Sequence, residues 1–243
     1  MDVFVSWSGG KDCCLATYRA QKAGHRIRRL ASIVTEHSGE VWPHRIPPQV
    51  VELQAEALGI PLTRTITTVD SYNDSYRDML QKFQAEGITG GVFGDVSVGN
   101  YLAEKHLNWV NSVCEPAGIT PILPLWDEGR ASLLTDLIDS GFTAIIIVVD
   151  DTRLGKEWLG RKLDHETLSE LRARAESSPS GQVGYYHTLV IDGPIFAKRL
   201  EITEFEPVLI YGNWFMGIHD CCLVEKTGTG SKAAVTPRSL HND

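Results

Sequence analysis

The sequence predicts an α/β protein in which a doubly wound parallel sheet is followed by a smaller α+β domain. From residue 1 to about residue 126, short apolar runs alternate with amphipathic helical windows, which is the pattern of β-α-β units. A glycine closes three of these windows, and glycine just past a helix is a common stop signal. From residue 185 on, strand-like runs follow one another directly, as they do in an antiparallel sheet.

The elements of the first half follow from these patterns. Strands are expected where aliphatic and β-branched residues run together, at residues 3–5, 30–34, 62–67 and 91–93. Helices are expected where apolar residues recur with helical spacing, at residues 12–23, 48–58, 71–86 and 98–117. Prolines punctuate the chain between Pro121 and Pro124, and we therefore place a domain boundary at about residue 125.

The second half is expected to form the smaller domain, over residues 126–226, after a first domain at residues 1–125. Its expected helices cover residues 131–140 and a segment that ends near residue 175. Its expected strands cover residues 143–149, 185–190, 196–205 and 208–215, with turns at residues 192–194 and at Glu206-Pro207. Residues 227–243 lack apolar periodicity and are expected to form a disordered tail.

Composition and charge narrow the function classes. Lys+Arg 23 against Asp+Glu 31 give a formal net charge of −8, which argues against broad binding to nucleic acid or to an anionic membrane. The longest apolar run, residues 144–149, is too short to span a bilayer, and the N-terminus shows no targeting signal. The five cysteines form no Cys-x-x-Cys pair, so neither a zinc site nor a disulfide framework is expected, and we expect a cytoplasmic protein.

The turn between the first strand and the first helix is a candidate phosphate site. Gly9 and Gly10 allow a ligand to approach the backbone, and the first amides of the following helix have no partner inside it. Such amides favour an anion, to which Ser8 and Lys11 would add a hydroxyl and a positive charge. The alternative for Ser-Gly-Gly alone is an ordinary strand-to-helix turn.

The spacing of this loop matches neither a Walker-type Gly-Lys-Ser/Thr loop nor a Gly-x-Gly-x-x-Gly turn. It resembles the Ser-Gly-Gly-x-Asp-Ser loop of ATP pyrophosphatases, which cleave ATP between its α and β phosphates. Cys13 departs from that pattern by replacing a serine, and a thiol is a weaker hydrogen-bond donor than a hydroxyl. The resemblance implies ATP as the cofactor and a nucleotide-binding loop of Ser8, Gly9, Gly10, Lys11, Asp12 and Cys13.

Polar residues that follow the strands are further candidates, because ligands of doubly wound sheets bind beyond the carboxyl ends of the strands. Gly94 and Asp95 follow the fourth strand, and we expect Asp95 and Asp12 to bind Mg²⁺ beside the phosphates. The alternative for Asp95 is a cap of the next helix. His44 lies in a proline-rich loop, where a histidine is more often a surface residue than a functional one.

Several separate segments resemble one family, that of diphthine–ammonia ligase and its relatives. They are the loop at residues 8–13, residues 53–62, Phe93-Gly94-Asp95, Pro124-Leu125-Trp126, residues 157–164 and residues 188–196. The resemblance implies an adenine-nucleotide α-hydrolase-like domain followed by a smaller α+β substrate domain. It also implies a reaction in which a carboxylate is activated as an acyl-adenylate and aminated by ammonia, with release of AMP and pyrophosphate.

The resemblance also implies roles for individual residues. Lys11, Asp12 and Asp95 would be catalytic, because the departing pyrophosphate needs charge stabilisation. Substrate-binding residues would be His44 of the first domain and, from the second domain, Trp158, Gly160, Arg161, Gln182, Tyr185 and His187. The usual alternative for Arg161 is a surface ion pair.

The second-domain motif departs from the family. Gln182, Tyr185 and His187 stand at positions where the family pattern has acidic residues. Those carboxylates would be expected to bind a cationic group, so their loss makes diphthine a doubtful acceptor. The implied partners are ammonia and a carboxylate on a small molecule or a modified protein side chain, and a homo-oligomer is compatible with the sequence. Two alternatives stay open, an RNA-modifying ATP pyrophosphatase and a domain that senses ATP without turning it over.

Overall fold

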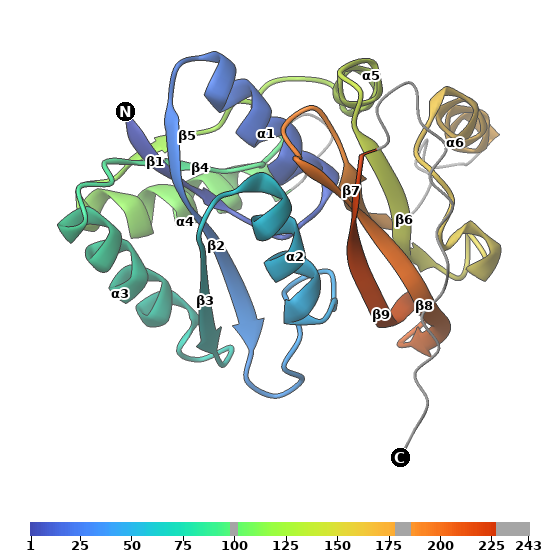
Figure 1. Cartoon of the computed structure of the whole chain (residues 1–243), viewed down its shortest axis with the longest axis horizontal. Helices are drawn as coiled ribbons and strands as arrows, with labels where there is room; N and C mark the ends of the chain where they lie inside the picture. The colour runs from blue at the N-terminus through green and yellow to red at the C-terminus, as the bar shows by residue number, and fades with distance from the viewer. Residues whose placement is uncertain (98–101, 178–185, 227–243) are drawn as a thin grey trace.

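The computed structural model describes residues 1–97, 102–177 and 186–226 (Figure 1). The expected tail at residues 227–243 and the substrate-binding candidates Gln182 and Tyr185 lie outside these ranges, as does the expected start of a helix at residue 98. No helix in the described ranges has the length and apolar character needed to cross a membrane.

The first half forms a five-stranded parallel sheet in the order β3-β2-β1-β4-β5. Its strands are β1 (Asp2–Ser6), β2 (Arg26–Thr35), β3 (Leu62–Thr67), β4 (Gly90–Val92) and β5 (Thr120–Ile122). The predicted doubly wound sheet is confirmed. The strand order reverses between β1 and β4, and the carboxyl ends of strands at such a reversal are the usual ligand site of this architecture.

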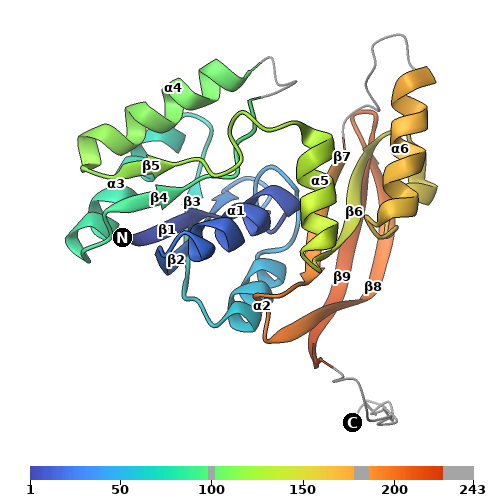
Figure 2. The same cartoon turned by 90° about the horizontal axis from the view of Figure 1, so that it is seen from above.

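Helices cover both faces of this sheet. α1 (Lys11–Lys22) and α2 (Pro48–Leu58) lie on one face, whereas α3 (Tyr72–Ala85) and α4 (Ala103–Cys114) lie on the other (Figures 1 and 2). A short 3₁₀ turn, η1 (Glu115–Ala117), follows α4 and is closed by Gly118 in the left-handed conformation. The sheet is therefore enclosed between two helical layers, and its carboxyl edge remains for a ligand.

The second half forms a four-stranded antiparallel sheet in the order β7-β6-β9-β8. Its strands are β6 (Thr143–Asp150), β7 (Tyr186–Asp192), β8 (Lys198–Ile210) and β9 (Asn213–Glu225). α5 (Arg130–Asp139), the 3₁₀ turn η2 (Lys156–Trp158) and α6 (His165–Ser177) complete this half. The predicted α+β character of the second domain is confirmed.

One predicted turn is wrong. The chain does not turn at Glu206-Pro207, because both residues lie within β8, where Pro207 is opposite Met216 of β9. β8 lies at the end of the sheet, and proline is tolerated in such a strand because its missing N–H faces outward. The hairpin turns at Tyr211-Gly212 instead, where both residues have positive φ angles of 47° and 77°, as in a type I′ turn.

The two sheets share the layer formed by α1 and α2, which lies between them (Figures 1 and 2). A single core of buried side chains runs through this layer and includes Leu15 of α1, Val51 of α2, Ile146 of β6 and Leu189 of β7. Burial of apolar surface on both sides of α1 fixes its position relative to both sheets. The amino end of α1 is consequently held between β1 and β7.

Arg19 of α1 holds the segment that joins the two halves. Its guanidinium donates hydrogen bonds to the carbonyl oxygen of Pro124 at 3.0 Å and to Oδ2 of Asp136 at 2.7 Å, and it also pairs with Glu128. Guanidinium groups bind planar carboxylates with this forked geometry. Arg19 thus ties α1 of the first half to α5 of the second.

Candidate functional site

The candidate site is the loop between β1 and α1, at the reversal point of the first sheet. β1 ends at Ser6, α1 begins at Lys11, and Gly10 is the N-cap with no side-chain hydrogen bond to the helix. Gly9 has a φ angle of 78°, in the left-handed region that favours glycine. The loop therefore exposes backbone groups, rather than side chains, at the amino end of α1.

Hydrogen bonds from other parts of the chain hold the carbonyl groups of Ser8 and Gly9 in this loop. The carbonyl oxygen of Ser8 lies 2.9 Å from Nδ1 of His44, and that of Gly9 accepts a hydrogen bond from the amide of Val190 at 3.0 Å. In a trans peptide the carbonyl and the next N–H point in opposite directions. The N–H groups of Gly9 and Gly10 therefore point away from these partners, as an anion cradle requires.

Lys11 supplies the positive charge of the loop. Its Nζ lies 2.7 Å from Oδ2 of Asp12 and 5.6 Å from the ring centroid of Tyr186. Burial is the largest influence and lowers the pKa of Lys11, but the charge and hydrogen bond of Asp12 together with Tyr186 outweigh it, so the net pKa is raised. Lys11 thus stays cationic at neutral pH, next to the two loop amides.

Cys13 ties the loop to the first turn of α1. Its Sγ lies 3.2 Å from the carbonyl oxygen of Gly10 and accepts a hydrogen bond from Oγ of Ser8 at 3.7 Å. The side chain is buried. The thiol therefore takes part in the loop's hydrogen bonding at the position where the pyrophosphatase pattern has a hydroxyl.

Gly94 brings the end of β4 against α1. A Cβ at this position would lie 2.8 Å from the backbone of Asp12 and Cys13, a distance that no side chain can relieve. The close packing places Asp95 near Asp12. Burial raises the pKa of Asp95, the hydrogen-bonded His106 lowers it, and the charge of Asp12 raises it further.

These two aspartates fit a magnesium ion that also binds phosphate oxygens, because Mg²⁺ is commonly held by one or two carboxylates together with substrate phosphates. The described residues contain no group of three or more His, Cys, Asp or Glu side chains that could hold a metal ion by themselves. The roles of Asp12 and Asp95 as magnesium ligands therefore remain predictions.

His44 is buried, unlike the surface histidine that is usual in such a loop. Its ring lies 4.6 Å, centroid to centroid, from that of His187 on β7. A Cβ on Gly10 would lie 2.5 Å from Cε1 of His44, so the histidine rests directly on the phosphate loop. Since the carbonyl oxygen of Ser8 can only accept, Nδ1 of His44 carries the proton and Nε2 is the acceptor nitrogen of the ring.

Both histidines of this pair are neutral at physiological pH. Burial lowers the pKa of His44 to about 4, the hydrogen bond to Ser8 opposes that shift, and the charge of Lys11 adds to it. Burial together with His44 and Lys11 lowers the pKa of His187 to about 2. The two imidazoles thus line the loop without adding charge.

Mild acid is expected to destabilise the fold through His44. In the unfolded chain His44 takes up a proton as the pH falls below its pKa of 6.5, whereas in the folded chain it takes up that proton only near pH 4. The free energy of unfolding therefore falls as the pH falls through this window. The loss is at most about 1.4 kcal/mol per pH unit for each such histidine. Urea unfolding between pH 7.5 and pH 5 measures it.

The matched variants for this measurement are His44→Gln and His37→Gln. His44→Gln is expected to show a shallower pH dependence than the wild type, whereas His37→Gln, at an exposed position, is expected to keep the wild-type slope. Identical slopes for the wild type and His44→Gln would contradict the assignment of a neutral buried imidazole.

Trp158, Gly160 and Arg161 lie elsewhere in the second half. The Arg161 guanidinium stacks over the buried Trp158 ring at 4.1 Å and donates two hydrogen bonds to Glu170 of α6, at 3.0 and 2.6 Å. Gly160 faces Met216 of β9. The contacts described for these three residues are with η2, α6, β6 and β9 rather than with the phosphate loop, and their role in substrate binding remains a prediction.

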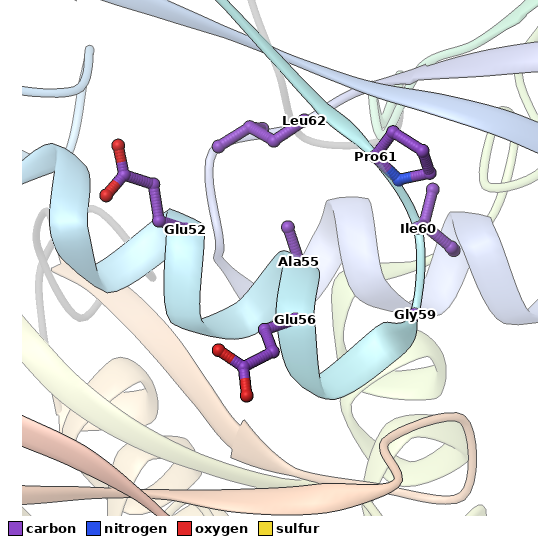
Figure 3. A pocket seen from close by; sticks show the side chains of 7 residues that line it. All are labelled: Glu52, Ala55, Glu56, Gly59, Ile60, Pro61 and Leu62. Atoms are coloured by element: carbon purple, nitrogen blue, oxygen red, sulfur yellow. The ribbon is translucent and has the colours of Figure 1, made fainter.

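A shallow hollow beside α2 is not part of this site (Figure 3). Its lining residues are Glu52, Ala55, Glu56, Gly59, Ile60, Pro61 and Leu62. The hollow lies at the amino end of β3, whereas the phosphate loop follows the carboxyl end of the parallel strand β1. None of the predicted site residues lines it.

The structure adds three side chains to the site that the sequence did not single out. Gln54 of α2 donates a hydrogen bond to the carbonyl oxygen of Gly9 at 3.0 Å, and Oγ1 of Thr188 accepts one from the amide of Lys11 at 3.1 Å. Arg130, the first residue of α5, is exposed and acts electrostatically on Tyr186. Burial raises the pKa of Tyr186, Lys11 lowers it, Asp12 raises it and Arg130 lowers it. Gln54 and Thr188 lie in segments that carry the family resemblance, and Gln54 had a signal of its own as a polar residue on the apolar stripe of its helix.

Two protein-family models match this chain, one in each half of the structure. The model described as "Diphthamide synthase N-terminal domain" matches residues 1–121, and that described as "Diphthamide synthase C-terminal domain" matches residues 130–224. The first match contains the phosphate loop, and the second contains β7.

Two individual relatives of this chain share the same name. A protein of Danio rerio named diphthine–ammonia ligase is 31% identical over 228 residues, which cover 83% of this chain and 86% of that protein. A protein of Schizosaccharomyces pombe with the same name is 29% identical over 224 residues, which cover 86% of this chain and 37% of the longer yeast protein. The chain thus belongs to the diphthamide synthase family, in which these relatives are named diphthine–ammonia ligase.

Proposed function

We propose that this chain is an ATP-dependent amide ligase of the diphthine–ammonia ligase type. It adenylates a carboxylate and aminates it with ammonia, releasing AMP and pyrophosphate. The observation that carries the proposal is the position of β7 across the phosphate loop, where Thr188 binds the amide of Lys11 and Val190 binds the carbonyl of Gly9. An acceptor bound along β7 would therefore lie beside the phosphates of ATP.

The first step joins a carboxylate oxygen of the acceptor to the α-phosphorus of ATP and breaks the bond from that phosphorus to the departing pyrophosphate. Negative charge accumulates on the pyrophosphate, where the amides of Gly9 and Gly10 and the ammonium group of Lys11 stabilise it. The hydrogen bonds of Ser8 and Gly9 to His44 and Val190 fix these amides before the substrate arrives. Little reorganisation is then needed during the reaction.

The second step uses the lone pair of ammonia to attack the acyl carbon. The bond from that carbon to the oxygen of AMP breaks, and the nitrogen loses a proton to give the amide. A magnesium ion bound by Asp12 and Asp95 would supply further positive charge to the phosphates. The close approach of Gly94 to the first turn of α1 brings Asp95 into the neighbourhood of Asp12.

The acceptor is proposed to be neutral or anionic beside its reactive carboxylate. His187, at a position that is acidic in the family pattern, is held neutral by burial, which lowers its pKa to about 2. Within the described part of the chain Arg130 has no ion-pair partner, and the nearby Glu128 is taken by Arg19. This side of the loop therefore offers the positive charges of Lys11 and Arg130 and a neutral imidazole, and the carboxylate of Asp12 is paired with Lys11.

ATP turnover is expected to yield AMP and pyrophosphate, because the loop resembles that of ATP pyrophosphatases and lacks the Walker-type sequence. Ion-exchange chromatography after incubation with ATP, Mg²⁺, ammonium and a panel of carboxylates measures the products. The Lys11→Ala variant provides the background rate. ADP and inorganic phosphate as the main products would refute the mechanism, and turnover that requires RNA would favour an RNA-modifying enzyme.

A further inference from the structure

We propose that Gln54 is a positioning residue that holds the phosphate loop and the strand β7 in register with each other. The inference rests on the proposed function, because it assigns the nucleotide to this loop. Gln54 lies on α2, and its side chain is completely buried, with 0% exposure. It belongs to neither of the two elements that it joins.

The side-chain amide of Gln54 has a defined orientation. Its Nε2 donates hydrogen bonds to the carbonyl oxygens of Gly9 at 3.0 Å and Val190 at 2.7 Å, and its Oε1 accepts one from Nε1 of Trp7 at 3.0 Å. An indole N–H can only donate and a backbone carbonyl can only accept, so a flipped amide would lose all three bonds. Both hydrogens of the amide nitrogen are thereby used.

The bond to Gly9 sets the direction of a phosphate-binding amide. Because the peptide is planar and trans, the carbonyl of Gly9 held toward Gln54 directs the N–H of Gly10 the opposite way. A Cβ on Gly9 would lie 2.6 Å from Oε1 of Gln54, which shows how closely the loop rests on this side chain. Loss of the Gln54 amide would leave the Gly9 carbonyl held by the Val190 amide alone, which weakens the hold on the direction of the Gly10 N–H.

The hydrogen bond from Gln54 to the carbonyl oxygen of Val190 connects β7, in the second half of the molecule, to the phosphate loop. The amide of Val190 also donates to the carbonyl of Gly9, so Gly9, Val190 and Gln54 form a closed hydrogen-bonded group. Thr188 and His187 precede Val190 on β7 and contact the loop and His44. A shift of β7 at Val190 would therefore displace the residues that face an acceptor.

The test compares three variants of the full chain. Gln54→Glu keeps the size of the side chain and the acceptor for Trp7 but removes both donors when the carboxyl is ionised. Gln54→Met removes every hydrogen bond at similar volume. Trp7→Phe is the matched control, because it breaks the same buried network at Oε1 while leaving both bonds to the loop and to β7.

The readout is ATP affinity measured by titration calorimetry without acceptor, together with the melting temperature. Both Gln54 variants are expected to weaken ATP binding about tenfold or more, which corresponds to a hydrogen-bond contribution of ordinary size, whereas Trp7→Phe is expected to keep the wild-type affinity. Binding by Gln54→Glu is expected to recover partly as the pH falls, relative to wild type at the same pH, because a protonated carboxyl can donate again.

Equal losses of ATP affinity in Gln54→Glu and Trp7→Phe, or wild-type affinity in either Gln54 variant, would overturn the positioning role. The affinity measurement needs no turnover. A wild-type protein that binds ATP but forms no AMP would refute the proposed function alone and leave the assignment of Gln54 intact.

Discussion

Replacement of Lys11 by alanine is expected to lower ATP turnover by about 10²- to 10³-fold, the usual cost of removing one preorganised group that stabilises developing charge. Asp12 holds Nζ of Lys11 at 2.7 Å and keeps the amine protonated by raising its pKa against the effect of burial. The cation is thus fixed before ATP binds. Initial rates of AMP formation at saturating ATP measure the loss.

The control for this measurement is Lys22→Ala on the same helix. Lys22 lies in the last turn of α1, where its Nζ is 4.5 Å from the ring centroid of Tyr18, so its loss removes a charge of the same sign far along the helix from the loop. Wild-type rates are expected for Lys22→Ala. A Lys11→Ala protein with an unchanged circular dichroism spectrum and full activity would place the catalytic site elsewhere.

The elements predicted most accurately are those whose signals are local. The helix at Pro48–Leu58 and the strand at Leu62–Thr67 match the structure at both ends. Proline opens that helix and Gly59 ends it with a φ angle of 65°, so its boundaries depend on residues within the helix or next to it. Such signals can be found without knowing what the helix packs against.

The elements predicted poorly depend on sheet context. β5 was not expected, because the prolines from Pro121 on indicated a domain boundary, and Pro207 suggested a turn within what is a single long strand. Both prolines lie in strands at the end of their sheets, where a missing N–H is tolerated. The position of a strand within a sheet is set by tertiary packing and is not encoded by the neighbouring residues.

The same distinction applies to the site. The residues Ser8–Cys13 are contiguous, and the sequence therefore predicted the loop as a unit. The groups that orient it come from far along the chain, since the bond from Gln54 to Val190 spans 136 positions and that from Lys11 to Thr188 spans 177. Only the folded chain shows that α2 and β7 meet at the loop.

A carboxylate flanked by a trimethylammonium group, as in diphthine, is expected to be a poor acceptor. Carboxylates or aromatic faces hold quaternary ammonium groups in proteins. Near the loop on β7, His187 is neutral, with its pKa lowered to about 2 by burial, and the charges that act on Tyr186 are those of Lys11, Asp12 and Arg130. A cationic acceptor would meet the like charges of Lys11 and Arg130, while the Asp12 carboxylate is already paired with Lys11. Like-charge contact costs several kcal/mol at a specific interface.

The decisive assay is amidation of diphthine-modified elongation factor 2, compared with AMP release on neutral and anionic carboxylates. His187→Glu is expected to reduce the use of an anionic acceptor at least tenfold, because it sets a negative charge beside that acceptor, and to lower ATP affinity less, because the ring contact of His187 is with His44 rather than with the phosphate loop. His219→Glu, on the exposed hairpin beside Glu206, serves as the charge-matched control and is expected to behave as wild type. Robust amidation of diphthine by the wild-type chain would overturn the assignment, since it would require a cation subsite that neither His187 nor Arg130 can provide.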